Sequence, residues 1–386
     1  MKKKLHITIY GQDLNHTRAH YTFGKLLFPH AEKITFCTEP KNREFIENYN
    51  QVGLPIAFHM KKYEESIPAF MERSRDFLNS QDIVIIDEFY YDYPSPFFLK
   101  KLFQGIKPKL ILAFHNINLW FNPGFSLHPK KIIRNFYSKI YKEAADGYVV
   151  ISPTIQKHIR DNRFTEKPVY FLPHSVPDLD GLTQKEPAEQ IIVGVPGGVD
   201  PMRRNYELLL ETIENHHQDF PSIKFILIGA SVNKPESRAI IERAHKINQD
   251  ADREIIQTFD QRLSPQYFLQ QIHKSDILLA NLDVTFKGTK STETYGLTKE
   301  SGTAYLSIES ARPLIAPKEY KMMLGYEEPV LSYADKEDFS RILKELHDRQ
   351  INLELLNQLT FDNSHKFFRQ AQESAQALLN DFISSA

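Results

Sequence analysis

The chain has 386 residues, 41% of them hydrophobic and 25% charged, with a net charge of −1 at pH 7. These values are ordinary for a globular protein of two or three domains. The single cysteine, Cys37, excludes a disulfide framework and a zinc site built on paired cysteines. No apolar run reaches the roughly 18 residues of a membrane-spanning helix, and the short apolar stretch after the basic start predicts a first strand rather than a signal peptide.

Short apolar runs alternate with amphipathic stretches in the first half of the chain. The runs are rich in Val, Ile and Phe and are flanked by polar segments, which is typical of buried parallel strands. Helices are expected at Tyr63–Leu78 and Pro129–Ala145, and the apolar stripe of the second is expected to pack on the sheet. The expected strands are His6–Tyr10, Lys33–Thr38, Ile83–Ile86, Leu110–Phe114, Gly147–Ile151 and Val169–Leu172.

A proline-rich polar segment, residues 173–190, interrupts this alternation and is interpreted as a linker. A second α/β series follows it, so the fold class is α/β with two parallel sheets. A final amphipathic helix is expected at His365–Ser384. The expected strands are Ile191–Val195, Lys224–Ile228, Glu254–Thr258, Asp276–Ala280 and Pro313–Ala316. The expected helices are Arg204–Asn215, Pro235–Ala251, Pro265–Lys274, Thr303–Ser310 and Asp338–Gln350.

Charge is distributed unevenly along the chain. Residues 1–180 carry +6 and residues 181–386 carry −7. Residues 97–142 contain nine Lys and Arg, interleaved with aromatic residues, and no acidic residue. A solvated surface and attraction to an anionic membrane or a phosphorylated substrate are both consistent with this segment. No nucleic-acid-binding motif accompanies it, so we expect no nucleic-acid partner.

The first strand after the linker ends in Pro196-Gly197-Gly198, and a loop with Arg203 and Arg204 then leads into a helix. Glycines let the backbone approach a ligand closely, a helix N-terminus attracts anions, and arginine forks suit phosphate. The segment matches neither GxGxxG nor GxxxxGK[ST], so it indicates neither a dinucleotide fingerprint nor a P-loop. It predicts a diphosphate site, with a tight turn and solvated arginines as the alternative.

A second candidate anion site lies at the segment YGLTKESGTAYLSIES. Lys299, Ser301 and the backbone around Gly302 could surround a phosphate at a helix N-terminus. Glu309 lies near the end of the same helix, where the dipole does not favour an anion. Its carboxylate therefore suggests a specific role, such as binding a ribose, with an exposed helical residue as the alternative.

These motifs, in this order, resemble the C-terminal half of GT-B glycosyltransferases of the glycogen-synthase-like (family 4-like) group. The Lys-x-Ser-Gly pattern resembles that of a divergent bacterial branch. The likeness covers residues 190–320 well and the first half only by general pattern. Gly198 stands about where the group has an arginine, and Ser301 stands where it has the first of two glutamates. The resemblance implies a donor site formed by Gly197, Gly198, Arg203, Arg204, Tyr295, Lys299, Ser301, Gly302 and Glu309.

The resemblance also implies an architecture of two Rossmann-like domains facing a cleft. Residues 1–175 would bind the acceptor, 176–190 would link the domains, and 191–362 would bind the nucleotide sugar. Residues 363–386 would form a helix that crosses back to the first domain.

In the first domain, several polar residues follow predicted strands. His115 is the candidate catalytic residue, as a general base or as a residue that orients an acceptor hydroxyl. Asp87 and Glu88 follow another predicted strand, and either could be an acid/base or a second acceptor contact. His174, in the linker, could approach the donor. The expected acceptor-binding residues are Gln12, Asn15, His16, Glu88 and Asn116.

The predicted function is sugar transfer from a nucleotide-diphosphate-sugar donor to a hydroxyl of a surface glycan, glycolipid or glycoprotein, with retention slightly favoured. No metal is expected, since no DxD-like carboxylate cluster stands out and Asp178-Leu179-Asp180 lies in the linker. No cofactor is expected besides the nucleotide sugar, which is the donor substrate. The protein is expected to be cytoplasmic, and residues 97–142 could bring it to an anionic membrane surface. Two alternatives stay open: a non-catalytic GT-B-like partner subunit, and a sugar-nucleotide epimerase.

Overall fold

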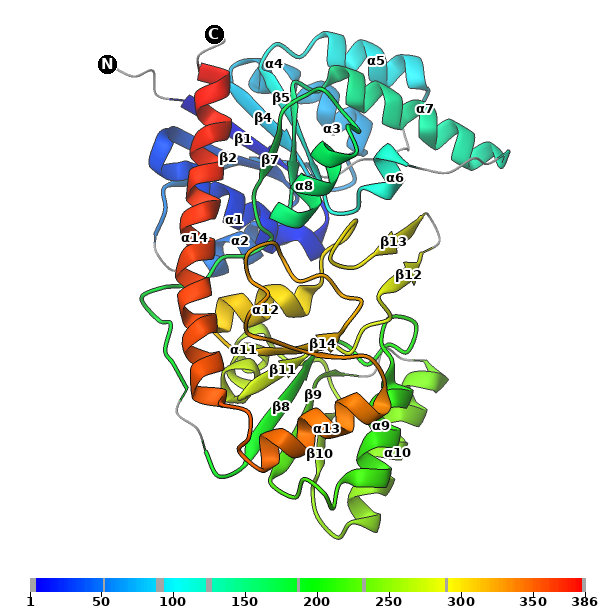
Figure 1. Ribbon diagram of the computed structural model, residues 1–386. Helices are drawn as coiled ribbons and strands as arrows, with labels where there is room; N and C mark the ends of the chain where they lie inside the picture. Colours follow the sequence, from blue (N-terminus) through cyan, green and yellow to red (C-terminus); the bar gives the residue numbers. More distant parts are fainter. Residues whose placement is uncertain are drawn as a thin grey trace. The chain divides into compact units, whose positions relative to one another are not determined.

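The computed structural model describes residues 5–50, 53–87, 94–122, 127–185, 188–230, 234–288 and 291–383. The chain forms two compact units (Figure 1). Unit 1 contains the chain up to Ser175 together with the residues from Arg369 onward, and unit 2 contains Val176–Gly288 and Thr292–Phe368.

Unit 1 is built on a seven-stranded parallel sheet with the strand order β3-β2-β1-β4-β5-β6-β7. All the strands predicted in this half are present, and β3 is an additional edge strand whose residues are only half-buried. The strands are β1 (Leu5–Tyr10), β2 (Ala31–Thr38), β3 (Ile56–Met60), β4 (Ile83–Ile86), β5 (Lys109–Phe114), β6 (Gly147–Val150) and β7 (Val169–Phe171). The α-helices are α1 (Thr17–Leu27), α2 (Pro40–Tyr49), α3 (Ile67–Arg73), α4 (Arg75–Asn79), α5 (Pro96–Gln104), α6 (Asn118–Phe121), α7 (Pro129–Ala144) and α8 (Pro153–Asp161).

The single helix expected at Tyr63–Leu78 is wrong, because α3 and α4 are separate. Helix α3 begins only after Ser66, whose hydroxyl accepts a hydrogen bond from the backbone N–H of Ala69. It ends at Arg73, and the next residue, Ser74, is buried, with its hydroxyl hydrogen-bonded to the His59 ring at 2.9 Å. A tertiary contact thus fixes a break that the apolar spacing does not show.

Unit 2 contains a six-stranded parallel sheet in the order β10-β9-β8-β11-β14-β15, and a separate hairpin. The strands are β8 (Ile191–Pro196), β9 (Ile223–Ala230), β10 (Ile256–Phe259), β11 (Ile277–Leu279), β14 (Leu314–Pro317) and β15 (Val330–Tyr333), with β12 (Thr285–Lys287) and β13 (Thr292–Thr294) in the hairpin. The helices are α9 (Tyr206–His216), α10 (Pro235–Asp250), α11 (Pro265–Lys274), α12 (Gly302–Ser310), α13 (Lys336–His347) and α14 (Leu353–Ile383).

The two sheets share one topology. In each, the chain moves outward over three strands, returns to the other side of the first strand and then continues outward. The order therefore reverses between β1 and β4 in unit 1 and between β8 and β11 in unit 2. In open parallel sheets, ligands bind outside the carboxyl ends of the strands at such a reversal. This fold class, predicted from the alternation of apolar runs, is confirmed.

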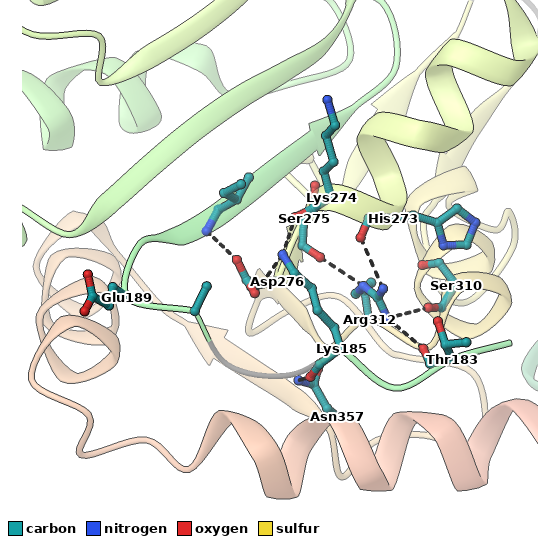
Figure 2. A network of polar contacts seen from close by, with 12 residues as sticks. Thr183, Lys185, Glu189, His273, Lys274, Ser275, Asp276, Ser310, Arg312 and Asn357 are labelled. Atoms are coloured by element: carbon teal, nitrogen blue, oxygen red, sulfur yellow. Dashed lines mark hydrogen bonds and ion pairs between the residues drawn. The ribbon is translucent and has the colours of Figure 1, made fainter.

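The segment after Val176 is irregular, but it is held firmly on unit 2 (Figure 2). The buried Arg312 donates hydrogen bonds to the carbonyls of Ser275 at 2.9 Å and Thr183 at 3.4 Å. Lys185 forms an ion pair with the buried carboxylate of Asp276, at 2.8 Å. These contacts tie residues 183–185 to the start of β11, so this part of the predicted linker has fixed partners.

Helix α14 begins at Leu353, twelve residues before the expected start, and belongs to both units. In unit 2, the Ser364 hydroxyl donates to the carbonyl of Ile308. In unit 1, the Ser374 hydroxyl accepts from the N–H of Phe171 at 2.9 Å, and Asp381 accepts from the Tyr170 hydroxyl at 2.7 Å. Across the described residues, none of the helices combines the length and the apolar character needed to traverse a bilayer.

Candidate functional site

Unit 2 contains a pocket of about 270 Å³ at the carboxyl end of its sheet. One side is the Pro196–Gly197 turn that ends β8, and the other is the start of α12 at Ser301, Gly302 and Thr303. The cationic residues Arg203, Arg204 and Lys299 line it, with Tyr295 and Glu300. An apolar wall is formed by Phe268, Leu282 and Leu306.

The turn after β8 depends on Gly197. Its φ is +98°, and a Cβ at this position would lie 2.2 Å from Nη2 of Arg204. The Arg204 guanidinium donates to the carbonyl of Gly198 at 2.9 Å and to that of Pro196 at 3.0 Å. Arg204 was expected to bind a diphosphate, but its guanidinium braces the turn. Arg204 therefore lines the pocket as part of the turn that it stabilises.

The N-terminus of α12 is shaped by Glu300. Its Oε1 accepts hydrogen bonds from the N–H of Ser301 at 2.9 Å and from the hydroxyl of Tyr320 at 2.5 Å. Burial and the Glu300 carboxylate raise the pKa of Tyr320 well above its usual value, so the phenol stays protonated and donates. Ser301 caps the helix by accepting from the N–H of Thr303 at 3.2 Å. The positive end of the α12 dipole therefore lies at the pocket.

Two cations flank the ring of Phe286 beside this helix end. The Arg203 guanidinium lies 5.4 Å from the ring centroid, and Nζ of Lys299 lies 5.9 Å from it. Burial lowers the pKa of Lys299, and the nearby charge of Arg203 lowers it further. An anion in the pocket would offset both effects, so the site is electrostatically prepared for a negatively charged ligand.

Two predicted donor residues do not line the pocket. Gly198 contributes through its carbonyl, which holds Arg204. Glu309 is half-buried in the last turn of α12, seven residues after Gly302, or about 10 Å along the helix axis. Leu306, one turn earlier, occupies the wall of the pocket instead. The pocket therefore gives no support to a ribose-binding role for Glu309.

Unit 1 has a cluster of imidazoles around one buried carboxylate, again at the carboxyl ends of strands. Asp87 is the first residue after β4, and His115 is the first after β5. His16 and His20 stand four residues apart at the start of α1, which follows β1. Asp87 Oδ1 lies 2.7 Å from Nε2 of His115, and Asp87 Oδ2 lies 2.7 Å from Nε2 of His20.

Burial and hydrogen bonding fix the carboxylate. Asp87 is fully buried, and the His20 side chain is 1% exposed. A Cβ at Gly11 would lie 2.2 Å from the His20 ring, so the glycine makes room for it. Burial by itself would raise the pKa of Asp87, but His115 and His20 together hold it far below its usual range. Asp87 is therefore ionised and holds both rings in place.

The other imidazoles are kept neutral. The His16 ring stacks on that of His115 with centroids 4.0 Å apart, and the His174 ring lies edge-on at 5.7 Å from His115. Burial, together with His115, lowers the pKa of His16 to about 4. Burial and the same neighbour lower that of His174 well below its usual value. At neutral pH both rings are uncharged.

The cluster has the geometry of a carboxylate–imidazole dyad. When Nε2 of a neutral His115 donates to Asp87, its Nδ1 becomes a hydrogen-bond acceptor and a base. The side chain of His115 is 14% exposed, so it can meet a ligand, whereas His20 cannot. His115, which was predicted as catalytic, therefore has a partner that orients it.

His16, Asp87 and His115 also present three donor atoms within 4.8 Å of one another, as a metal site would. Both Asp87 oxygens, however, already accept 2.7 Å bonds from imidazoles. The rings of His16 and His115 are stacked with their planes 23° apart, although a metal must lie near the plane of each ring that it binds. The geometry favours hydrogen bonding over metal coordination.

The remaining predicted acceptor residues have mixed outcomes. Gln12 is buried, and its side-chain N–H donates to the carbonyl of Cys37 at 3.1 Å, so it holds β1 to β2. Asn116 is half-buried next to His115. The side chain of Asn15 and all of Glu88 lie outside the described part of the structure. Sequence reasoning missed His20, for which the four-residue spacing from His16 was the available signal.

No family model matches the sequence, and no curated protein matches it. Solved structures do share its fold. Sucrose-phosphate synthase from Thermosynechococcus elongatus is 13% identical, with 99% of this chain and 100% of that chain covered and a TM-score of 0.67. A glycosyltransferase from Rickettsia africae is 12% identical over 98% of both chains, with a TM-score of 0.65. Anabaena HepE in complex with UDP is 10% identical over 100% of both chains, with a TM-score of 0.64. With its two parallel sheets and this full-length likeness, the chain has the GT-B fold.

Proposed function

We propose that this protein is a glycosyltransferase that moves a sugar from a nucleotide-diphosphate-sugar donor to an acceptor hydroxyl. The observation that carries the proposal is the unit 2 pocket, where Arg203 and Lys299 converge on the N-terminus of α12. Anabaena HepE, which shares the fold, was solved with UDP, and such a nucleotide is the ligand that the pocket's charge suits.

In this proposal, unit 2 stabilises the leaving nucleoside diphosphate. Negative charge develops on the diphosphate as its bond to the sugar breaks. Lys299, Arg203 and the positive end of α12 are already in place before the reaction, so they stabilise that charge without reorganising. The apolar wall of Phe268, Leu282 and Leu306 suits the less polar parts of the donor.

Unit 1 supplies the base in this proposal. Asp87 orients His115, and Nδ1 of His115 takes the proton of the acceptor hydroxyl as the oxygen attacks the anomeric carbon. A positioned general base supports direct displacement, which inverts the anomeric centre. This favours inversion over the retention that the resemblance alone slightly favoured, and the anomeric configuration of the product decides between them.

The acceptor class follows from the resemblance and from the basic segment of unit 1. A sugar hydroxyl on a surface polysaccharide, a glycolipid or a glycoprotein remains the proposed acceptor, and the protein would act in the cytoplasm or on the inner face of the plasma membrane.

The proposal is tested first at the donor pocket. Thermal unfolding with UDP, GDP, dTDP and ADP, and with CMP as a control, should show a selective rise in stability with one diphosphate. The rise should be lost in Lys299→Ala and kept in Lys41→Ala, a substitution of an exposed lysine on α2 of unit 1. No shift with any nucleotide in the folded protein would contradict the proposal.

One specific observation favours a second candidate, the non-catalytic partner subunit. The guanidinium of Arg204 is already hydrogen-bonded to its own turn, and Glu309 does not line the pocket, so two residues expected to bind the donor have other surroundings. Such a subunit would show no nucleotide-dependent stabilisation and would form a stable complex with an active glycosyltransferase.

A further inference from the structure

Helix α7 has apolar side chains that unit 1 covers and others that it leaves exposed. Tyr137, Ser138 and Tyr141 are buried in unit 1. Ile132, Ile133 and Phe136 are exposed, Ile133 to 51% and Phe136 to 55%. The expectation that the whole apolar stripe packs on the sheet is therefore wrong, because the stripe is wider than the face that unit 1 covers.

The exposed side is continuous with the start of the helix. Leu127, two residues before α7, is also exposed. The ring of Tyr141 packs edge-on against Phe103 of α5, 5.2 Å away, so the far end of α7 is anchored to unit 1. In Figure 1 the N-terminal turns of α7 extend past the end of α5. We call Leu127, Ile132, Ile133 and Phe136 the docking face.

Positive charge borders the docking face. Lys130 and Lys139 are exposed on either side of the stripe, and Lys139 forms an ion pair with Glu143 at 3.7 Å. On the neighbouring α5, Lys100 and Lys101 are exposed. Lys142 differs, because its Nζ donates to the carbonyl of Trp120 at 2.8 Å and supports the fold.

We propose that the docking face lies on a membrane surface that carries anionic lipids, with α7 in the plane of the interface. Apolar side chains flanked by lysines are the pattern of interfacial helices, whose apolar side enters the boundary of the acyl chains while the lysines meet lipid phosphates. A second copy of this chain would bring lysines against lysines, and the cores of protein interfaces are depleted of charge. Charge complementarity therefore selects the lipid surface.

This inference deepens the proposed function and rests on it only in naming a membrane-borne acceptor. An enzyme held by α7 would meet lipid-linked acceptors at the surface where they are concentrated. Lipid binding needs no donor, and donor binding needs no lipid, so either can fail while the other holds.

The test is co-sedimentation of the full chain with vesicles. We expect binding to an equimolar phosphatidylcholine–phosphatidylglycerol mixture at least about tenfold tighter than to phosphatidylcholine alone, and weaker with rising salt. The double variant Ile133→Ser, Phe136→Ser should lose at least about tenfold in affinity for the mixed vesicles. Lys130→Glu should lose several-fold and show a smaller salt dependence.

The control is Leu355→Ser, which removes an apolar side chain of similar exposure, 53%, from α14 in unit 2. It should bind like the parent protein. Because all the replaced side chains are exposed, we expect every variant to fold, and circular dichroism melts check this. Equal binding to both kinds of vesicle, no binding, or an equal loss in the control would overturn the proposal. A dimer in ultracentrifugation that Phe136→Ser dissociates, without vesicle binding, would assign the face to a second copy instead.

Discussion

The two units have the same strand order but opposite chemistry where that order reverses. In unit 1 the reversal holds a buried carboxylate surrounded by imidazoles. In unit 2 it holds Arg203, Lys299 and a helix N-terminus, all of which favour an anion. The comparison teaches that topology sets where a site forms, while the loops that follow the strands decide its chemistry.

The two sites also differ in how they are supported. Asp87 and His20 are buried and hydrogen-bonded to each other, so a change at either one affects folding as well as chemistry. In unit 2 the Arg203 guanidinium is exposed and Lys299 is half-buried, while the turn beneath them is braced by Arg204. Substitutions of the cations should therefore change ligand binding more than stability.

The largest expected effect lies in unit 1. Asp87→Asn removes the charge that orients His115 and should lower kcat by roughly 10²–10⁴-fold, with a small change in the KM for the donor. Steady-state kinetics of sugar transfer measures this. A matched carboxylate-to-amide control is Glu39→Gln, at the half-buried N-cap of α2. Unchanged kcat in a folded Asp87→Asn protein would remove the dyad from the mechanism.

The second largest expected effect is on nucleotide binding in unit 2. Lys299→Ala should weaken binding of the nucleoside diphosphate by roughly 10–100-fold, as the loss of one charge-assisted hydrogen bond would. Titration calorimetry measures it, with Lys41→Ala as the control. Because Asp87 belongs to unit 1 and does not line this pocket, Asp87→Asn should leave this affinity unchanged, and a loss in both variants would mean that the two sites are not separate.

The neutral imidazoles make unit 1 acid-sensitive. The pKa of His16 is about 4 in the folded protein against 6.5 in the unfolded chain, so below pH 6.5 the unfolded state binds a proton first. The free energy of unfolding should fall by about 2 kcal/mol from His16 between pH 7 and pH 5. Urea unfolding at the two pH values measures this, and His16→Gln should flatten the dependence. An identical slope in that variant would contradict the assignment.

The smallest expected effect concerns the turn in unit 2. Gly197→Ala places a Cβ at φ +98° and against Arg204, and should lower the free energy of unfolding by about 1–2 kcal/mol. Gly302→Ala is its matched control, because a Cβ there meets nothing within 4 Å and alanine favours the helix. Urea denaturation compares them, and equal effects would show that the turn is not strained.

Local residue pattern alone determined much of this protein. The apolar runs predicted most of the parallel strands, because a strand buried on both faces must be apolar along its length. The glycine turn after β8 and the Lys-x-Ser-Gly start of α12 could be recognised because a backbone that approaches an anion needs small residues and a helix end. Lys299, Ser301 and Gly302 were predicted together on that basis, and they line one pocket.

Only the tertiary structure decided which side chains meet. His20 and Asp87 are 67 residues apart, and no local signal pairs them. Arg204 is a residue type that binds phosphate, but its guanidinium donates to the carbonyl of Gly198 in its own loop. Ile133 and Phe136 continue an apolar stripe, yet they remain exposed. Local sequence specifies backbone preference and periodicity, whereas the partner of a polar group and the covered width of a helix depend on neighbours that folding brings together.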